Sequence, residues 1–325
     1  MTAPLVIAVT GASGFVGARV VSALAGVGHV VRACVREAMA PSTGVEPYLT
    51  GDLIDGPGWE RAFEGADVLV HCAGAAHVRN AEPSWLHRVN ADGSRRVAEC
   101  AAAAGIGRVV FASSLKVHGD SSGAEPLQAS SPLRPGDAYA RSKLEGELAL
   151  REIAAANRLE LVVLRPPLMY GPGVSANFLK LLTAVSQRRP LPVALVRNRR
   201  SLLAVGNFAD AVRVCVSHPA AAGRDFLLSD GTPVSTPELI RRCAAALGVA
   251  PRLWPVPVPL LRAVGALLGR SAMMERLVGS FEVDDANIRD TLDWRPLETM
   301  DRALVATAAW FRQRSPQAVT RRPVS

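Results

Sequence analysis

Tyr139 and Lys143 are four residues apart, at the start of a segment, Tyr139–Ala156, whose pattern predicts a helix. At positions i and i+4, both side chains lie on one face of that helix. An isolated phenol titrates at about pH 10, and a neighbouring ammonium lowers that pKa by stabilising the phenolate. The pair is therefore suited to passing a proton to or from a substrate oxygen.

A glycine-rich turn directly follows the first apolar run and opens the first predicted helix. Its residues include Gly11, Ser13, Gly14, Phe15, Val16 and Gly17. Gly11 allows a tight turn, Gly14 lets the backbone approach a pyrophosphate, and Gly17 permits close packing of helix and strand. The helix N-terminus directs free N–H groups at the phosphates, so the turn predicts dinucleotide binding. With an oxidised nicotinamide, Tyr139 would exchange a proton while hydride moves at the same carbon.

The end of the second predicted strand bears on which nicotinamide cofactor binds. Val30–Val35 is followed by Arg36, not by the acidic residue that binds the ribose hydroxyls in NAD-selective sites. A guanidinium suits a 2′-phosphate through forked hydrogen bonds, although a surface arginine is also ordinary in an arginine-rich chain. We expect NADP(H) or NAD(H), with NADP(H) favoured.

Two serines and a lysine stand at the end of the predicted strand Arg108–Ser113. We expect Ser114 to hold the substrate oxygen beside Tyr139 and Ser113 to satisfy local backbone groups, with the reverse order left open. Lys116 is one of only three lysines in the chain. Its position predicts contact with a substrate hydroxyl, acyl group or phosphate, and a solvated lysine at a strand end is the alternative.

Short apolar runs alternate with helical patterns through about the first 165 residues. The predicted strands are Pro4–Val9, Val30–Val35, Val45–Tyr48, Val68–His71, Arg108–Ser113 and Leu161–Leu164, and a long helix is predicted over Ser84–Ala104. Continuous Val, Ile and Leu runs are typical of strands covered on both faces. The alternation predicts an α/β fold, a Rossmann-type doubly wound parallel sheet spanning residues 1–165.

The rest of the chain differs in composition and no longer alternates strand and helix patterns. Residues 166–314 are richer in proline, and we expect two or three helices, small sheets and some elements that return to the Rossmann core. This smaller region is the expected substrate-binding part, and residues 315–325 are expected to form a flexible tail.

Composition limits the function classes. Hydrophobic residues make up 49% of the 325 residues, and the net charge is +8 with the arginines spread along the chain. This distribution favours a small anionic ligand over nucleic acid. Five cysteines without metal-ligand spacing fit reduced thiols in a cytoplasmic protein and predict no metal site. Prolines interrupt the apolar stretch Pro255–Gly269, which is shorter than the roughly 20 residues of a membrane span, so we interpret it as buried or partner-facing.

Together these motifs resemble the extended branch of the short-chain dehydrogenase/reductases, the NAD-dependent epimerase/dehydratase family, over nearly the whole chain. Supporting stretches are His71–Gly74, Ser113–Gly119, Arg165–Gly173, Asn198–Ser201, Arg200–Asn207 and Leu292–Pro296. The family includes UDP-sugar epimerases, sugar-nucleotide dehydratases and 4-keto-reductases. The overall sequence pattern is similar to that of bacterial enzymes of surface-polysaccharide sugar synthesis.

The resemblance implies further site residues. Cofactor-side matches are Asp52, Leu53, Ala73, Gly74, Asn90 and Pro166, and the matches for holding a nucleotide diphosphate are Asn177 and Arg200. Ordinary structural roles stay open for Asp52, Asn90, Asn177 and Arg200. The family also implies a homodimer, formed through a four-helix bundle that includes the Tyr139 helix.

One departure from the family pattern narrows the activity. Leu115 and Lys116 stand where the dehydratases carry an Asp-Glu pair that moves the protons for water loss, which argues against a dehydratase. We expect an NAD(P)-dependent oxidoreductase acting at C4 of a nucleotide-activated, UDP-type hexose. A 4-keto-sugar reductase is ranked ahead of a UDP-sugar 4-epimerase with tightly bound NAD. A steroid- or flavonoid-type dehydrogenase and a non-catalytic NADP sensor are the weaker alternatives.

Overall fold

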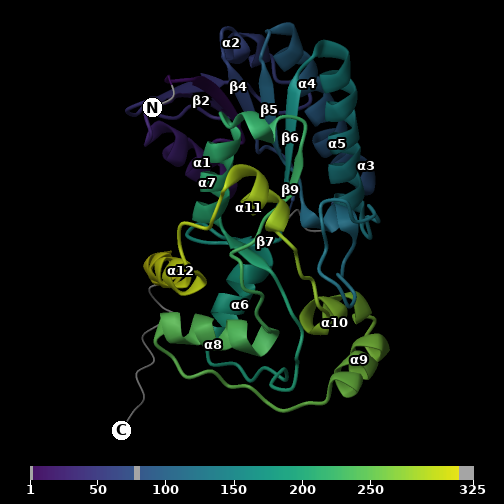
Figure 1. Cartoon of the computed structure of the whole chain (residues 1–325). Coiled ribbons are helices and arrows are strands. Elements are labelled where there is room, and N and C mark those ends of the chain that lie inside the picture. The colour runs from purple at the N-terminus through teal and green to yellow at the C-terminus, as the bar shows by residue number, and fades with distance from the viewer. Residues whose placement is uncertain (1–2, 77–80, 315–325) are drawn as a thin grey trace.

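The computed structural model describes residues 3–76 and 81–314, and its centre is a seven-stranded parallel sheet (Figure 1). The strands are β1 (Val6–Thr10), β2 (Val30–Val35), β3 (Val45–Leu49), β4 (Val68–His71), β5 (Arg108–Ala112), β6 (Glu160–Arg165) and β9 (Asp225–Leu227). Their order is β3-β2-β1-β4-β5-β6-β9. The expected doubly wound sheet is confirmed, and each predicted strand lies within two residues of its observed bounds. Because the strand order reverses beside β1, a crevice for ligands is expected at the carboxyl ends there.

Helices cover both faces of this sheet. Those of the first half are α1 (Phe15–Ala25), α2 (Trp59–Phe63), α3 (Pro83–His87), α4 (Gly93–Ala103) and α5 (Ala138–Asn157). In Figure 1, α4 and α5 stand together on one side of the sheet, while α1 and α7 (Val205–Cys215) stand on the other. The helix expected over Ser84–Ala104 is interrupted by a π-helical turn at Arg88–Asp92.

The second half contains more helices than the sequence pattern predicted. Beside α7 they are α6 (Ala176–Ser186), α8 (Thr236–Leu247), α9 (Val258–Leu267), α10 (Ser271–Val278), α11 (Ala286–Leu292) and α12 (Met300–Arg314). The prediction of two or three was wrong because prolines open helices here: Pro237 and Pro259 lie in the first turns of α8 and α9. The first turn has spare N–H positions, so proline is tolerated there.

Two strands form a separate parallel pair, β7 (Leu168–Tyr170) with β8 (Leu202–Ala204). By contrast, β9 extends the main sheet beside β6, and α7 packs on α1, so both elements return to the first half. The residues of the expected tail, 315–325, lie outside the described ones.

Three apolar clusters hold these layers together. One face of the sheet packs Val9 and Leu24 against Phe208, and the other packs Leu69 against Leu150. A third cluster, beneath α6, α8 and α12, is built around residues such as Phe178. All five cysteines are free thiols. Within the described residues, the helices are too short or too polar to cross a membrane.

Candidate active site

A cavity of about 770 Å³ opens at the carboxyl ends of β1 to β6. The predicted site residues that line it are Gly11, Ser13, Gly14, Phe15, Val16, Gly17, Arg36, Asp52, Leu53, Ala73, Gly74, Ser114, Lys116, Tyr139, Pro166 and Asn177. Three other predicted residues, Asn90, Lys143 and Arg200, lie outside this lining. The cavity therefore joins the glycine turn, the tyrosine and the substrate-side asparagine in one space.

The glycine turn has the geometry of a phosphate cradle. Gly11 has a φ of 67°, and a Cβ on it would approach the Ala73 backbone to 2.9 Å. A side chain on Gly17 would collide with the Gly11 carbonyl, so both positions demand glycine. Gly14 precedes α1 and provides no side-chain cap, which leaves the first N–H groups of α1 available to an anion. This cradle fits a dinucleotide pyrophosphate.

The wall at the ends of β2 and β3 is shaped by a polar turn. The Asp52 carboxylate accepts hydrogen bonds from the backbone N–H groups of Asp55, at 2.7 Å, and Ile54, at 2.8 Å. These bonds hold the pKa of Asp52 below its usual value. The ordinary structural role that the sequence left open for Asp52, in a turn, is therefore observed. Arg36 is exposed at the same end of the cavity.

Tyr139 lies in the first turn of α5, half-buried, and the cap of that helix fixes its position. The Asp137 carboxylate accepts a hydrogen bond from the Ala140 N–H at 2.8 Å. Ser114 hydrogen-bonds to the Tyr139 side chain, whereas the Ser113 hydroxyl donates to the buried Glu147 carboxylate. Ser114 is thus the serine beside the tyrosine, while Ser113 bonds to a side-chain carboxylate and not to the backbone groups expected from the sequence.

Burial shifts the ionisation of both members of the pair. Burial raises the pKa of Tyr139 to about 12, although the hydrogen bond from Ser114 opposes the shift. Burial also lowers the pKa of Lys143 to about 8, while the nearby Glu147 carboxylate acts in the raising direction. The Lys143 ammonium lies 4.1 Å from the centre of the Phe111 ring. At Tyr139 the Asp137 carboxylate acts in the same raising direction as burial. The lowering expected from the sequence depends on the ammonium together with an oxidised nicotinamide, so it stays a prediction.

Asn90 does not line the cavity but holds two segments beside it in place. Its Oδ1 accepts the Ala75 N–H at 2.7 Å, and its Nδ2 donates to the Ala75 carbonyl at 3.0 Å and to the Ser142 hydroxyl at 2.9 Å. A Cβ on Gly74 would lie 2.9 Å from Asn90 Oδ1. The π-helical turn thus turns Asn90 inward to fasten the segment after β4 to α5.

Lys116 lines the cavity but is engaged in ion pairs. Its ammonium pairs with Asp137, the cap of α5, and lies 3.3 Å from Asp120. Arg276 of α10 lies 3.6 Å from the same Asp137 carboxylate. The structure thus places Lys116 beside the start of the tyrosine helix, within a cluster of two acids and two bases.

Of the two residues matched to diphosphate binding, Asn177 lines the cavity and Arg200 does not. Asn177 lines the cavity at the start of α6, whose preceding residue Ser175 makes no side-chain cap. Arg200 donates to the carbonyls of Arg276, at 2.8 Å, and Gly279, at 3.2 Å. Burial lowers its pKa, and no carboxylate pairs with it among the described residues.

Several residues of this region were missed by the sequence analysis. Glu147 and Arg165, each at most 2% exposed, form a buried ion pair at 2.6 Å between α5 and β6. The signal for Glu147 was its spacing, one turn after Lys143. Trp59, Trp85 and Phe281 also line the cavity, and nothing in their local sequence marked them.

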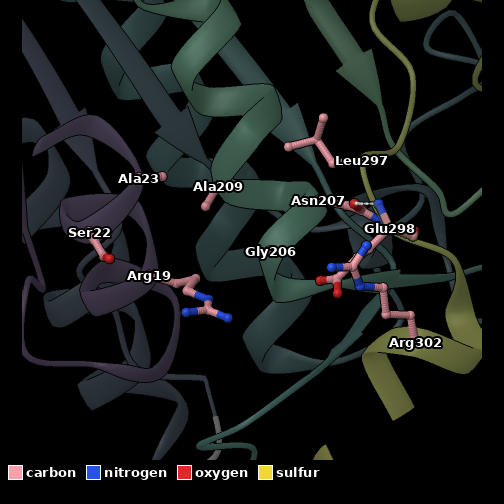
Figure 2. Close-up of a pocket in the computed structure, with 9 residues that line it drawn as sticks. All are labelled: Arg19, Ser22, Ala23, Gly206, Asn207, Ala209, Leu297, Glu298 and Arg302. Carbon is pink, nitrogen blue, oxygen red and sulfur yellow. Dashed lines mark hydrogen bonds between the residues drawn. The ribbon is translucent and has the colours of Figure 1, made fainter. Parts of the chain in front are cut away.

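A second, smaller cavity of about 310 Å³ lies between α1, α7 and the segment before α12 (Figure 2). Figure 2 shows Arg19 and Arg302 reaching toward it from opposite sides, with Glu298 near Arg302. Asn207 fixes Glu298 through two hydrogen bonds to its backbone, at 2.9 and 3.0 Å. The lining of this smaller cavity includes none of the predicted site residues, so we take the larger cavity as the candidate active site.

Known proteins are similar to this chain in sequence and in fold. A model described as the NAD dependent epimerase/dehydratase family matches residues 7–228. A UDP-glucose 4-epimerase from Vibrio cholerae is 37% identical over 95% of this chain and 96% of its own length. A ceramide reductase from Caulobacter vibrioides is 31% identical over 90% of this chain and 86% of its own. A short-chain dehydrogenase/reductase superfamily protein from Agrobacterium tumefaciens, solved with bound NAD, is 25% identical with a TM-score of 0.75, covering 95% of this chain and 98% of that one.

Proposed function

The chain belongs to the NAD dependent epimerase/dehydratase family, and from that premise we propose that it is a UDP-hexose 4-epimerase. The observation that carries the proposal is the enclosure of Tyr139 and Ser114 in the same cavity as the glycine cradle. The similarity to the Vibrio cholerae UDP-glucose 4-epimerase over almost the whole chain supports the choice of reaction. This reverses the ranking drawn from the sequence, which put a 4-keto-sugar reductase first.

In this proposal, Tyr139, Ser114 and Lys143 have different roles at C4 of the sugar. A bound nicotinamide supplies the hydride acceptor and donor for that carbon. Tyr139 takes the proton of the 4-hydroxyl as that carbon is oxidised and returns it on reduction. Ser114 holds the same oxygen through its hydroxyl, and the Lys143 ammonium adds positive charge that favours the phenolate.

Residues 166–314 supply the substrate side in this proposal. Asn177 and the uncapped N-terminus of α6 are suited to the diphosphate of a nucleotide sugar, because free N–H groups attract anions. Arg200, a half-buried guanidinium bonded only to carbonyls in the described structure, is proposed to add a second cationic contact. Lys116 is proposed to meet the sugar at the mouth of the cavity.

A 4-keto-sugar reductase in the synthesis of surface-polysaccharide precursors is the second candidate. Arg36 at the adenosine end favours it, because a 2′-phosphate binder suits an exchanging NADPH. The ceramide reductase relative is named for a reduction. A dehydratase lacks support, since Leu115 is buried and Lys116 is held by two carboxylates where that reaction needs a proton-transferring pair.

Cofactor retention and turnover distinguish the two candidates. The purified protein would be denatured and its released nucleotide identified, then assayed with UDP-glucose and UDP-N-acetylglucosamine without added cofactor. Retained NAD with interconversion of the 4-epimers is the expected result. An empty protein that consumes NADPH with a UDP-4-keto-hexose would replace the epimerase by the reductase. If neither reaction occurs and UDP fails to bind in calorimetry, the nucleotide-sugar assignment is wrong.

A further inference from the structure

The α9 helix has an apolar face that is wider than the part covered by the fold. On its inner side Leu261 and Gly265 are buried, and Gly265 makes room for Met274 of α10. The exposed apolar residues are Leu260, Val264, Leu267 and Leu268, with exposed fractions of 54%, 46%, 87% and 61%. At about 100° per residue, these four side chains form one strip next to the buried side.

The neighbouring helix continues this surface. Met273 at the start of α10 is 49% exposed. In Figure 1, α9 and α10 form a hairpin at the edge of the molecule, at the opposite end from β2 and β4. Scattered apolar side chains are normal on a protein surface, but a row along one helix marks an interaction site. This surface accounts for the apolar stretch that the sequence left as buried or partner-facing.

The charge around the strip is positive. Residues 251–278 contain four arginines and a single acidic residue, Glu275. Two of the four are paired, since Arg262 lies 3.2 Å from Glu275 and Arg276 lies 3.6 Å from Asp137. Arg270, in the turn between the two helices, is exposed and pairs with no acid among the described residues. An apolar strip beside the unpaired Arg270 complements an anionic lipid surface.

We propose that the α9–α10 hairpin docks this protein on an anionic membrane surface, with α9 lying in the headgroup region. Ten residues of helix span only about 15 Å, so α9 is suited to lie on a bilayer and not to cross it. A symmetric contact with a second copy is disfavoured, because it would place the same positive patch against itself. The proposal does not depend on which reaction the active site performs.

The hairpin also contacts the catalytic region. Arg276 of α10 lies 3.6 Å from Asp137, which caps the tyrosine helix, and its carbonyl accepts a hydrogen bond from Arg200. Docking through α9 therefore holds the surroundings of the cavity close to the membrane surface. An enzyme so placed is suited to exchanging substrate or product with partners that work on lipids.

Co-sedimentation with vesicles tests the proposal. The full chain would be mixed with vesicles of phosphatidylglycerol and phosphatidylcholine, and in parallel with vesicles of phosphatidylcholine alone. Binding to the mixed vesicles that weakens with salt is expected. Leu267→Glu should reduce that binding by about tenfold or more, because an inserted apolar group becomes a charge. The matched control is Val305→Glu, at an exposed apolar position on α12, which should bind as the wild type does.

Both variants alter exposed side chains, and circular dichroism with thermal melting verifies that they fold. Failure of the wild-type chain to bind the mixed vesicles would overturn the proposal. Equal binding by Leu267→Glu would overturn it as well. A shift of Leu267→Glu to a smaller species in size-exclusion chromatography, without vesicle binding by the wild type, would assign the strip to a protein contact instead.

Discussion

At Tyr139, burial and catalysis act in opposite directions. A pKa of about 12 keeps the phenol neutral near pH 7, yet oxidation of a hydroxyl needs a proton acceptor. Burial also disfavours the Lys143 ammonium and lowers its pKa to about 8. In the proposed reaction, the positive charge of a bound oxidised nicotinamide would add to that of Lys143 in favouring the phenolate.

Replacing Tyr139 by phenylalanine tests that role directly. Tyr139→Phe removes the proton-transferring hydroxyl while keeping the ring, so we expect turnover to fall by about 100- to 10,000-fold. Cofactor binding and the thermal midpoint should change little. The matched control is Tyr48→Phe, a half-buried tyrosine on β3, which should keep full activity. Near-normal turnover by Tyr139→Phe, measured with the substrate pair identified above, would remove this residue from the mechanism.

Residue spacing located the glycine turn and the paired Tyr139 and Lys143, because their chemistry depends on local geometry alone. It could not separate lining residues from positioning residues. Asn90 points into backbone contacts with Ala75, and Arg200 is directed at carbonyls. Packing between segments that are distant in the sequence decides which way a side chain points. Residue spacing within one segment cannot predict that direction.

At the scale of elements, α5 is fastened to the sheet by a buried ion pair. Arg165 at the end of β6 pairs with Glu147 of α5 at 2.6 Å and also with Asp225 of β9 at 2.9 Å. Glu147 in addition accepts the Ser113 hydroxyl after β5. One carboxylate thus joins three elements that surround the tyrosine.

Removing the charge of Glu147 should destabilise the fold. Glu147→Gln replaces the carboxylate by a neutral amide, so the buried Arg165 guanidinium loses its charged partner. Breaking a buried ion pair in this way lowers the free energy of unfolding by about 3–5 kcal/mol. Equilibrium urea unfolding measures the loss. The exposed Glu145→Gln, on the same helix, is the control and should change stability by less than about 1 kcal/mol. Equal stability of the two variants would contradict the role given to this pair.

A buried histidine makes stability depend on pH. His71 at the end of β4 bonds to Thr10 at 2.7 Å and Ser94 at 2.9 Å, and burial lowers its pKa to about 3. The unfolded state binds the proton below about pH 6.5, so stability should fall as pH drops from there toward 3, by about 1.4 kcal/mol per unit. Urea unfolding at pH 7 and pH 4.5 should show this loss, and His71→Gln should reduce it. An unchanged pH dependence in His71→Gln would assign acid sensitivity elsewhere.

The strands were predictable because each is a short continuous apolar run, and β2 and β4 matched their predicted bounds. The second half was harder. Proline in a first turn resembles proline in a loop when only the sequence is read, so α8 and α9 were not recognised as helices. Likewise, β9 is a three-residue strand that depends on its neighbour β6.

At the scale of the whole molecule, the active site lies where separately packed layers meet. The sheet supplies the glycine turn and Ser114, while Asn177 and Phe281 come from the second half. In the proposed function, substrate recognition and hydride chemistry would thus depend on different parts of the chain.

The family resemblance predicts a homodimer formed through a four-helix bundle whose helices include α5, the helix of Tyr139. Leu148 on α5 is 55% exposed, an apolar side chain on a helix otherwise rich in charge on its outer face. If two copies pair these helices into a four-helix bundle, Leu148→Glu places a charge in the contact and should give a monomer. Size-exclusion chromatography with light scattering measures the mass. Leu195→Glu, at an exposed position away from α5, is the control and should remain dimeric. A wild-type chain that is monomeric at micromolar concentration would contradict the prediction.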